Sequence, residues 1–448
     1  MLDLKYIREH PEEVSDRLAS RDADYIQVIE RLLSLDSTQR ELKTELDELR
    51  KQRNELSRQI GKLMKQGDVQ AAQESKQVVA EVNERIEIAL AEFKAVDSQC
   101  QHLLAELPNL PDISVPVGGE ESRELVKEWG EPPRFDFQPR DHVQLARELN
   151  LVDFPAAARV TGSGFQFFVG QGAVMQRALI NLMLEVHVSR HGYVEMRPPF
   201  MVKESSAFST GQLPKFSEEM YHVFVPLSQT GYGSTVQPHY YLIPTAEVPV
   251  CNYFREQILE QPNFPLKFVA YSPCWRVEAG HYGKEARGLM RVHQFEKVEL
   301  VNICAPEQSA GCLETITEEA EHILELLQLP YRRALLPSGD MGFAAAKTYD
   351  LEVYAAAMDE WLEVSSASNT LDFQARRAGI RFRREPGAKP EFVHMLNASG
   401  VALPRLLIAL LENYQLENGN VRIPQALLKY FGGIKYLSPP ENPIPFFD

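Results

Sequence analysis

Two runs of apolar residues at alternating steps of four and three constrain this chain more than any other feature. The first run comprises Val28, Leu32, Leu35, Gln39, Leu42, Leu46, Leu49, Arg53, Leu56, Ile60 and Leu63. The second run comprises Val79, Val82, Ile86, Ala89, Phe93, Val96, Cys100, Leu103 and Leu107. This spacing is typical of heptad helices, whose apolar stripes must pack against a partner. Because Gly67 and Asp68 form a turn signal between the runs, we predict an antiparallel two-helix coiled coil over about residues 26–107. At a rise of about 1.5 Å per residue each helix is about 55 Å long, and we expect so long a hairpin to extend into solvent.

The basic residues of this hairpin are concentrated toward its tip. One acid, Glu55, stands among six bases, which are Arg50, Lys51, Arg53, Arg58, Lys62 and Lys65. The returning helix, residues 68–107, has eight acids and three bases. The whole chain has a net charge of −16, so any nucleic acid must be bound by a local basic patch. The basic stretch is either a solvated helix face or a phosphate-binding surface.

The bulk composition indicates a water-soluble protein of two or three domains. The chain has 448 residues, of which 44% are hydrophobic and 25% charged. It contains no apolar run near the ~20 residues of a membrane span, and its first residues lack an apolar signal core. Five cysteines form no C-x-x-C pair. We therefore expect a reduced, cytoplasmic protein without membrane contact, disulfide framework or cysteine zinc site.

A segment rich in proline and glycine separates the hairpin from the rest of the chain. Residues 108–119 contain three prolines and two glycines, and we assign 1–107 to a helical arm, 108–125 to a linker and 126–448 to a second domain. In that domain several strand-like runs follow one another without an intervening helix. This order favours an α+β fold with an antiparallel sheet and flanking helices.

Arginines and acids cluster near the middle of the second domain. Arg276 and Glu278 stand two apart in a strand-like stretch, so we expect them to face the same side. Next come a loop and a second alternating run, with Arg287, Arg291, Phe295, Lys297 and Glu299. The pattern predicts a hairpin with a long charged loop whose cationic face binds a phosphorylated ligand. An exposed cross-strand ion pair between Arg276 and Glu278 is the alternative, and such pairs are worth little.

Three further groups have residue types suited to ligand binding. Thr245 and Glu247 end a strand pattern and could bind an ammonium group, or could begin a helix with Thr245 as its N-cap. Two strand patterns place Glu352 and Glu363 so that their carboxylates could share a cation such as Mg²⁺, or stay exposed on edge strands. Arg405 lies in the first turn of a predicted helix, where a cation opposes the helix dipole unless an anion is bound.

These motifs, in this order, resemble those of the class II aminoacyl-tRNA synthetases, and of the seryl-tRNA synthetases in particular. Arg276-x-Glu278 followed by Arg291-x-x-x-Phe295 is similar to motif 2, and His293–Gln294–Phe295 has the seryl wording. The helix 174–187 with Pro198–Pro199 resembles motif 1, the dimer-interface element, and the segment 396–405 resembles motif 3. The segment 372–377 matches a seryl-enzyme signature, and an N-terminal two-helix arm is also a property of this family. The resemblance covers essentially the whole chain.

The resemblance implies a ligase that activates L-serine with ATP and Mg²⁺ and transfers it to tRNA(Ser), and also to tRNA(Sec) if the cell has one. It implies a homodimer with a class II catalytic sheet. It assigns catalytic roles to Arg276 and Arg405. The implied ATP contacts are Arg276, Val277, Glu278, Val292, Phe295, Glu363, Val364, Ser365, Ser366 and Arg405. The implied serine contacts are Thr245, Ala246, Glu247, Arg276, Glu299 and Ser399. Glu363 and Ser366 would bind Mg²⁺, and the six bases of residues 50–65 would bind tRNA.

Two other functions fit parts of the pattern. One is a synthetase-like enzyme that charges a carrier other than tRNA, and the other is a non-catalytic coiled-coil paralogue. The basic arm argues against the first, and the complete set Arg276, Glu278, Glu363 and Arg405 argues against the second.

The chain departs from the family at four positions outside the implied chemistry. Ala398 replaces a usual glycine, Tyr354 a tryptophan, Ala367 a cysteine and Gly164 an arginine.

Overall fold

The computed structural model describes residues 1–225, 239–278 and 287–446. Two compact units make up the chain, Met1–Pro108 and Asn109–Asp448. Within the described residues, no helix is both long enough and apolar enough to cross a bilayer.

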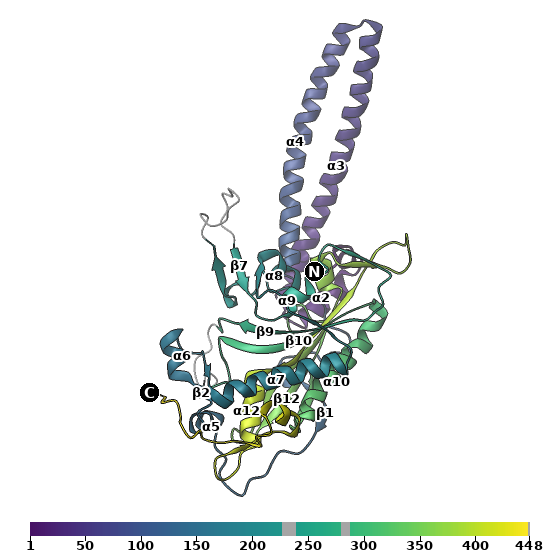
Figure 1. Cartoon of the computed structure of the whole chain (residues 1–448). Helices are drawn as coiled ribbons and strands as arrows, with labels where there is room; N and C mark the ends of the chain where they lie inside the picture. The colour runs from purple at the N-terminus through teal and green to yellow at the C-terminus, as the bar shows by residue number, and fades with distance from the viewer. Residues whose placement is uncertain (226–238, 279–286, 447–448) are drawn as a thin grey trace. The chain divides into compact units, whose positions relative to one another are not determined.

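The N-terminal unit contains the predicted coiled coil. Its helices are α1 (Leu4–Glu9), α2 (Pro11–Ala19), α3 (Tyr25–Gln66) and α4 (Val69–Glu106), and the last two run side by side (Figure 1). Gly67 ends α3 with a φ of 81°, which glycine adopts without strain, and the Asp68 side chain caps α4 by accepting from the Ala71 amide. Every position of both heptad runs is buried or half-buried. The heptad prediction is confirmed.

Polar contacts fix the register of the N-terminal unit. Gln39 interrupts the apolar seam, and its Nε2 donates to Asp97 Oδ1 of α4 at 2.6 Å. A polar pair at such a position disfavours slipped registers. Asp36 on α3 is 1% exposed, and it accepts two 2.8 Å bonds from Arg8 of α1. The heptad pattern did not predict α1 and α2, because they lie outside the periodic runs.

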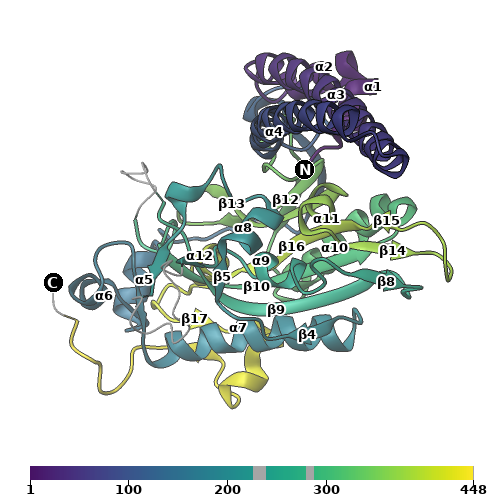
Figure 2. The ribbon, with the colours of Figure 1, turned by 90° about the horizontal axis from the view of Figure 1, so that it is seen from above.

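The C-terminal unit is built on an eight-stranded sheet that is antiparallel except where β4 pairs with β9. In spatial order the strands are β1 (Glu124–Trp129), β11 (Tyr331–Leu335), β12 (Lys347–Ala355), β13 (Glu360–Leu371), β16 (His394–Ala402), β10 (Gln294–Cys304), β9 (Leu266–Trp275) and β4 (Val194–Met196). Three long helices pack against it, α7 (Gly170–Ser189), α10 (Ser309–Leu326) and α12 (Leu403–Asn413). Figures 1 and 2 both show α7 running along β9. The α+β prediction is confirmed.

Short elements complete the C-terminal unit. The helices are α5 (His142–Glu148), α6 (Phe154–Val160), α8 (Glu204–Thr210), α9 (Glu247–Cys251) and α11 (Phe373–Ala378), with 3₁₀ turns at Glu120–Ser122, Ser217–Glu219, Pro306–Gln308 and Gln425–Phe431. The strands are β2 (Val152–Asp153), β3 (Phe167–Phe168), β5 (Met201–Lys203), β6 (His222–Phe224), β7 (His239–Leu242), β8 (Ile258–Glu260), β14 (Arg381–Arg383), β15 (Glu391–Phe392), β17 (Val421–Arg422) and β18 (Tyr436–Leu437). Strands β5, β7 and β6 form a small separate sheet.

Two of the four positions at which we expect the chain to depart from the family pattern lie opposite each other. Ala367 on β13 and Ala398 on β16 are directly paired across the sheet, and both are fully buried. A larger residue than usual at one position therefore faces a smaller one than usual at the other, which keeps the local volume nearly constant. Gly164 has a φ of 80°, which glycine adopts without strain, and a Cβ there would lie 2.5 Å from His293 Cδ2.

Candidate active site

Two adjoining cavities open over strands β10, β13 and β16. The first has a volume of about 410 Å³ and the second about 220 Å³. Arg276, Lys297, Glu363 and Ser399 line both. A ligand made of two joined parts could therefore place one part in each cavity, with their junction beside these four side chains.

Thr245 and Glu247 both line the first cavity. The Glu247 amide donates to Thr245 Oγ1 at 3.1 Å where α9 begins, but the N-cap of this helix is Ala246 and not Thr245. Ala246 is buried behind them. Glu247 Oε1 accepts from Gln374 Nε2 at 2.6 Å and from Asn397 Nδ2 at 3.1 Å. Burial and the charge of Glu299 raise the pKa of Glu247 to about 7.

Glu299 also lines the first cavity, and its neighbour Lys297 lies beside it. The Lys297 Nζ is 2.5 Å from Glu299 Oε2, and both residues are nearly inaccessible to solvent. Burial raises the pKa of Glu299, although Lys297 opposes this effect. Ser399 on β16 stands opposite Glu299 in the strand register. Carboxylates and a hydroxyl thus converge on a space suited to a small molecule with an ammonium group and a hydroxyl.

The second cavity gathers most of the predicted nucleotide contacts. Its lining includes Arg276, Glu278, Val292, Phe295, Glu363, Val364 and Arg405. The Arg276 guanidinium carbon lies 5.2 Å from the centroid of the Phe295 ring. Val277 does not line it, and its amide donates to the Glu219 carbonyl at 2.9 Å.

The strand placement of Arg276 and Glu278 is wrong. Strand β9 ends at Trp275, and Glu278 has a φ of 50°, which is incompatible with a strand. Glu278 instead pairs with Arg291 at 3.5 Å, and both side chains line the second cavity. The predicted charged loop falls partly on residues 279–286, which lie outside the described residues.

Glu363 lines both cavities and is in contact with Arg405. Arg405 is in the first turn of α12, as predicted, and its Nη1 donates to the Glu363 carbonyl at 3.0 Å. Glu363 and Ser366 both line the first cavity. Ser365 is buried below, where its hydroxyl donates to the Ser399 carbonyl.

The expectation that Glu352 and Glu363 share a cation is wrong. Their strands do pair at these residues, but the buried Glu352 carboxylate forms ion pairs with Arg123 and Arg332. Asp350 is instead the carboxylate near Glu363. It pairs with Ser366 in the strand register, and its buried Oδ1 has no hydrogen-bond partner. Burial and the charge of Glu363 raise the pKa of Asp350 well above the usual range of a carboxyl group.

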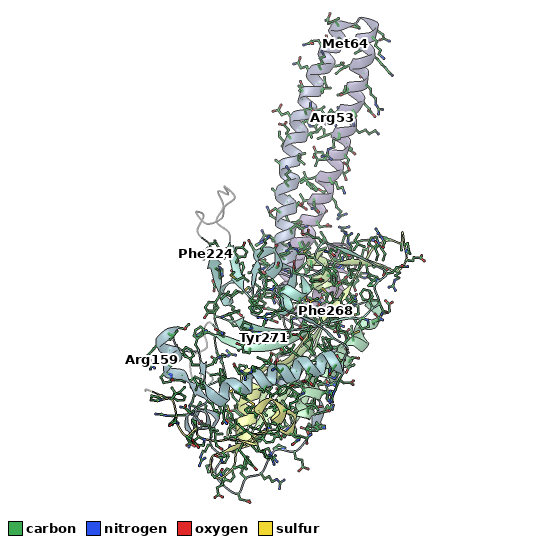
Figure 3. The ribbon with its side chains drawn as sticks, in the orientation of Figure 1. Arg53, Met64, Arg159, Phe224, Phe268 and Tyr271 are labelled. Carbon is green, nitrogen blue, oxygen red and sulfur yellow. The ribbon has the colours of Figure 1, made fainter. Side chains whose placement is uncertain are left out.

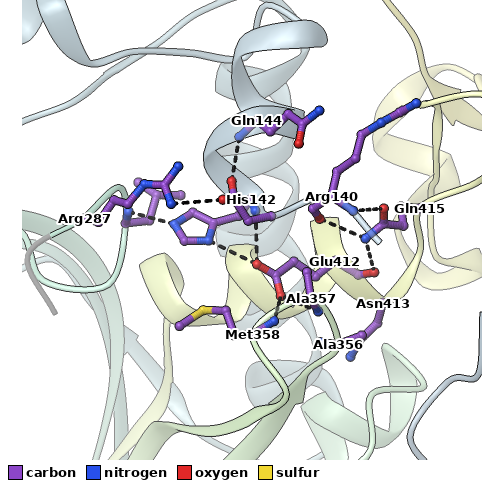
Figure 4. A network of polar contacts seen from close by, with 12 residues as sticks. Arg140, His142, Gln144, Arg287, Ala356, Ala357, Met358, Glu412, Asn413 and Gln415 are labelled. Atoms are coloured by element: carbon purple, nitrogen blue, oxygen red, sulfur yellow. Dashed lines mark hydrogen bonds and ion pairs between the residues drawn. The ribbon is translucent and has the colours of Figure 1, made fainter. Parts of the chain in front are cut away.

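A buried network around Glu412, shown in Figure 4, fixes the start of α5 against the end of α12. The Glu412 carboxylate accepts from the amides of His142, Ala357 and Met358 at 3.0–3.3 Å. The Leu289 amide donates to His142 Nε2 at 3.3 Å, which leaves His142 Nδ1 to donate to Glu412 Oε1 at 3.2 Å. Leu289 immediately precedes Met290, which lines the second cavity. The network therefore positions one wall of that cavity.

The six arm residues all lie on α3. Five are exposed, and Arg53 is half-buried at its seam position, where Figure 3 labels it. At about 100° per residue, Lys51, Arg58, Lys62 and Lys65 fall within an arc of about 60° opposite the apolar seam. These four cations form a stripe about 21 Å long at ~1.5 Å per residue, and we call it the basic stripe.

Comparisons with known proteins agree with this arrangement. Residues 1–111 match the model of the seryl-tRNA synthetase N-terminal domain, and residues 234–414 match that of the class II tRNA synthetase core domain (G, H, P, S and T). A serine–tRNA ligase of Geobacillus sp. (strain WCH70) is 49% identical over 98% of this chain and 100% of its own length. The crystal structure of Pyrococcus horikoshii seryl-tRNA synthetase complexed with ATP has a TM-score of 0.89 at 34% identity, covering 98% of this chain and 100% of that one. A cytoplasmic serine–tRNA ligase from Naegleria fowleri in complex with AMP has a TM-score of 0.84 at 27% identity, with 99% of both chains covered.

Proposed function

This chain belongs to the serine–tRNA ligase family, and we propose that it activates L-serine with ATP and transfers the seryl group to the 3′ end of tRNA(Ser). The observation that carries the proposal is the pair of cavities joined at Arg276. One cavity is lined by carboxylates suited to an amino acid, and the other holds a buried aromatic ring beside arginines. An aminoacyl-adenylate has these same two halves.

In the first cavity, Glu247 and Thr245 would bind the serine ammonium group. Glu299 and Ser399 would bind the serine hydroxyl. Alanine would leave these buried polar groups without partners, and such sites reject the analogue that lacks the hydroxyl strongly. Asn397 and Gln374, which the motif comparison did not single out, would hold the Glu247 carboxylate in place.

In the second cavity, Phe295 would stack on adenine, and Glu278 would accept from the adenine amino group. Val292 would supply a backbone contact. Arg276, at the junction of the cavities, would bind the α-phosphate, and Arg405 the γ-phosphate. In the structure Arg405 donates to the backbone carbonyls of Glu363 and Met290 and pairs with the Glu363 carboxylate at 3.4 Å, so an arriving phosphate would compete with these partly exposed contacts.

The residues at the junction also fit Mg²⁺, which usually takes one or two protein oxygens and completes its shell with phosphates and water. Glu363 and Ser366 would be its protein ligands. The buried Asp350 Oδ1 beside them has no partner, and this agrees with a cation nearby. When bound, Mg²⁺ would offset the negative charge of the phosphates.

The first step is an in-line attack of the serine carboxylate on the α-phosphorus of ATP, with pyrophosphate as the leaving group. In the second step the terminal ribose hydroxyl of the tRNA attacks the seryl carbonyl carbon, and AMP leaves. Neither step needs a protein nucleophile. Arg276 stabilises the charge that develops on the α-phosphate, and the fixed cavity walls orient the reactants.

The basic stripe on α3 would bind phosphates of the tRNA, because the rest of this acidic chain repels RNA. A tRNA(Sec) would be charged by the same contacts where the cell has one.

We also propose that α7 and the Pro198–Pro199 segment form a homodimer interface. We place the enzyme in the cytoplasm.

Two assays test the proposal. Serine-dependent exchange of pyrophosphate into ATP measures the first step, and charging of total tRNA measures the second. We expect both activities in the wild type and loss of both in Arg276→Ala, while Arg381→Ala, a control at an exposed arginine of β14, keeps both. Exchange without charging would indicate a carrier other than tRNA. Absence of exchange with every amino acid would indicate a non-catalytic paralogue.

A further inference from the structure

Four rings form a column on one face of the β6–β7 ribbon. His222 and Phe224 lie on β6, and His239 and Tyr241 on β7. The strand register pairs His222 with Tyr241 and Phe224 with His239. Since residues two apart on a strand share a face, and paired residues do too, all four rings lie on one side.

The rings touch one another along this face. Phe224 stacks on His239 with a centroid distance of 4.6 Å and an interplanar angle of 13°. His239 is 4.9 Å from His222, and Tyr241 is 4.8 Å from His222. The Tyr241 end is 4% exposed, whereas Phe224 at the other end is 60% exposed and is labelled in Figure 3. The column is therefore anchored in the core at one end and open to solvent at the other.

Hydrogen bonds fix the orientation of the two imidazoles. His222 Nε2 lies 2.8 Å from the Ser217 carbonyl, which can only accept, so this nitrogen carries a proton. In the neutral ring His222 Nδ1 is then an acceptor, and His239 Nε2 donates to it at 2.9 Å. Because these rings are already held in place, the protein loses little additional conformational entropy when a ligand stacks on them.

Both strands of the ribbon begin or end at the rim of the first cavity. Strand β6 starts two residues after Met220, and β7 ends two residues before Pro244. Met220 and Pro244 both line the first cavity. The column thus leads from the place where the seryl group would be transferred toward the solvent.

We propose that the exposed Phe224 ring, backed by the half-buried His239 ring, stacks a base of the single-stranded 3′ end of the tRNA as this end enters the first cavity. The inference rests on the proposed function. Unpaired bases bind proteins chiefly by stacking on aromatic side chains, and this contact tolerates any base. The tRNA end is the one substrate that must reach the cavity as an unpaired strand, and the column lies on the same rim.

The test compares intact serine tRNA with the same tRNA trimmed of its terminal CCA. Phe224→Ala should lower kcat/KM for tRNA in charging by roughly 5- to 100-fold and leave pyrophosphate exchange within twofold of wild type. Trimming should weaken tRNA binding to the wild type and weaken it much less in Phe224→Ala, because the stacking contact is already lost. Phe224→Tyr keeps a ring and should retain charging. Tyr436→Ala is the matched control, since Tyr436 is an exposed ring on β18 that lines neither cavity.

Three results would overturn the inference. One is unchanged charging by Phe224→Ala and His239→Ala. Another is an equal trimming penalty in Phe224→Ala and wild type. The third is a fall in exchange that matches the fall in charging, which would make the column a structural support of the cavity. A wild type that exchanges pyrophosphate but charges no tRNA would contradict the proposed function instead.

Discussion

Neutralising the basic stripe should weaken tRNA binding in a strongly salt-dependent way. The perturbation is the triple substitution Lys51→Gln, Arg58→Gln and Lys62→Gln. These side chains are exposed on the face of α3 opposite the seam, so the coiled coil should stay folded. A matched control removes the same charge from the partner helix with Lys76→Gln, Arg85→Gln and Lys94→Gln, all exposed on α4.

The magnitude follows from the number of phosphate contacts. Each contact contributes about 0.7–0.9 to the slope of log affinity against log salt concentration, so the stripe variant should lose about 2–3 units of slope. Between about 50 and 200 mM salt, the ratio of wild-type to variant affinity should therefore shrink by roughly 30-fold. Serine-dependent pyrophosphate exchange should not change, because it needs no tRNA.

The assay is equilibrium binding of serine tRNA by filter retention at four or more salt concentrations, with exchange measured in parallel. An unchanged slope in the stripe variant would refute the reasoning. So would an equal change of slope in the α4 control, since net charge alone would then explain the effect.

Three further predictions concern the C-terminal unit. The pKa of Glu247 is raised to about 7, so its contribution to stability is present below pH ~4.5 and is lost as the pH rises through 7. Glu247→Gln should therefore raise the free energy of unfolding by about 3 kcal/mol at pH 8 and leave it unchanged near pH 4, which urea titrations at both pH values would check. The same substitution should abolish pyrophosphate exchange. Glu412→Ala leaves one buried and two half-buried amides without an acceptor, so it should cost about 3–5 kcal/mol of stability and raise the KM for ATP. Glu412→Gln, whose amide oxygen still accepts, should cost less, and equal losses in thermal unfolding would argue against the network. Ala367→Cys should destabilise the sheet by about 1–3 kcal/mol because the larger side chain overpacks against the partner strand. Adding Ala398→Gly should recover part of this loss. If the stability changes of the two single substitutions simply add in the double mutant, the two positions do not compensate each other.

Sequence by itself determined the features that depend on local periodicity. Alternating steps of four and three specify one apolar stripe per helix, and a stripe must be buried, so the α3–α4 hairpin and its turn at Gly67 followed directly. The α+β class followed from strand-like runs that succeed one another without an intervening helix. The candidate site residues came from motif order, which transfers from relatives of the same fold without reference to distance.

Only the tertiary structure decided which charges meet. Glu352 resembled a cation ligand by spacing, but Arg123, which lies 229 residues away in the chain, neutralises it. The supporting roles of Lys297, Asn397 and Glu412 were likewise hidden, because single polar residues in apolar strands or helices carry no period. Glu278 left its predicted strand because the chain turns there with a positive φ. Short-range periodicity determines how a segment folds, whereas ion pairs and cavities depend on contacts between segments that only the packed sheet brings together.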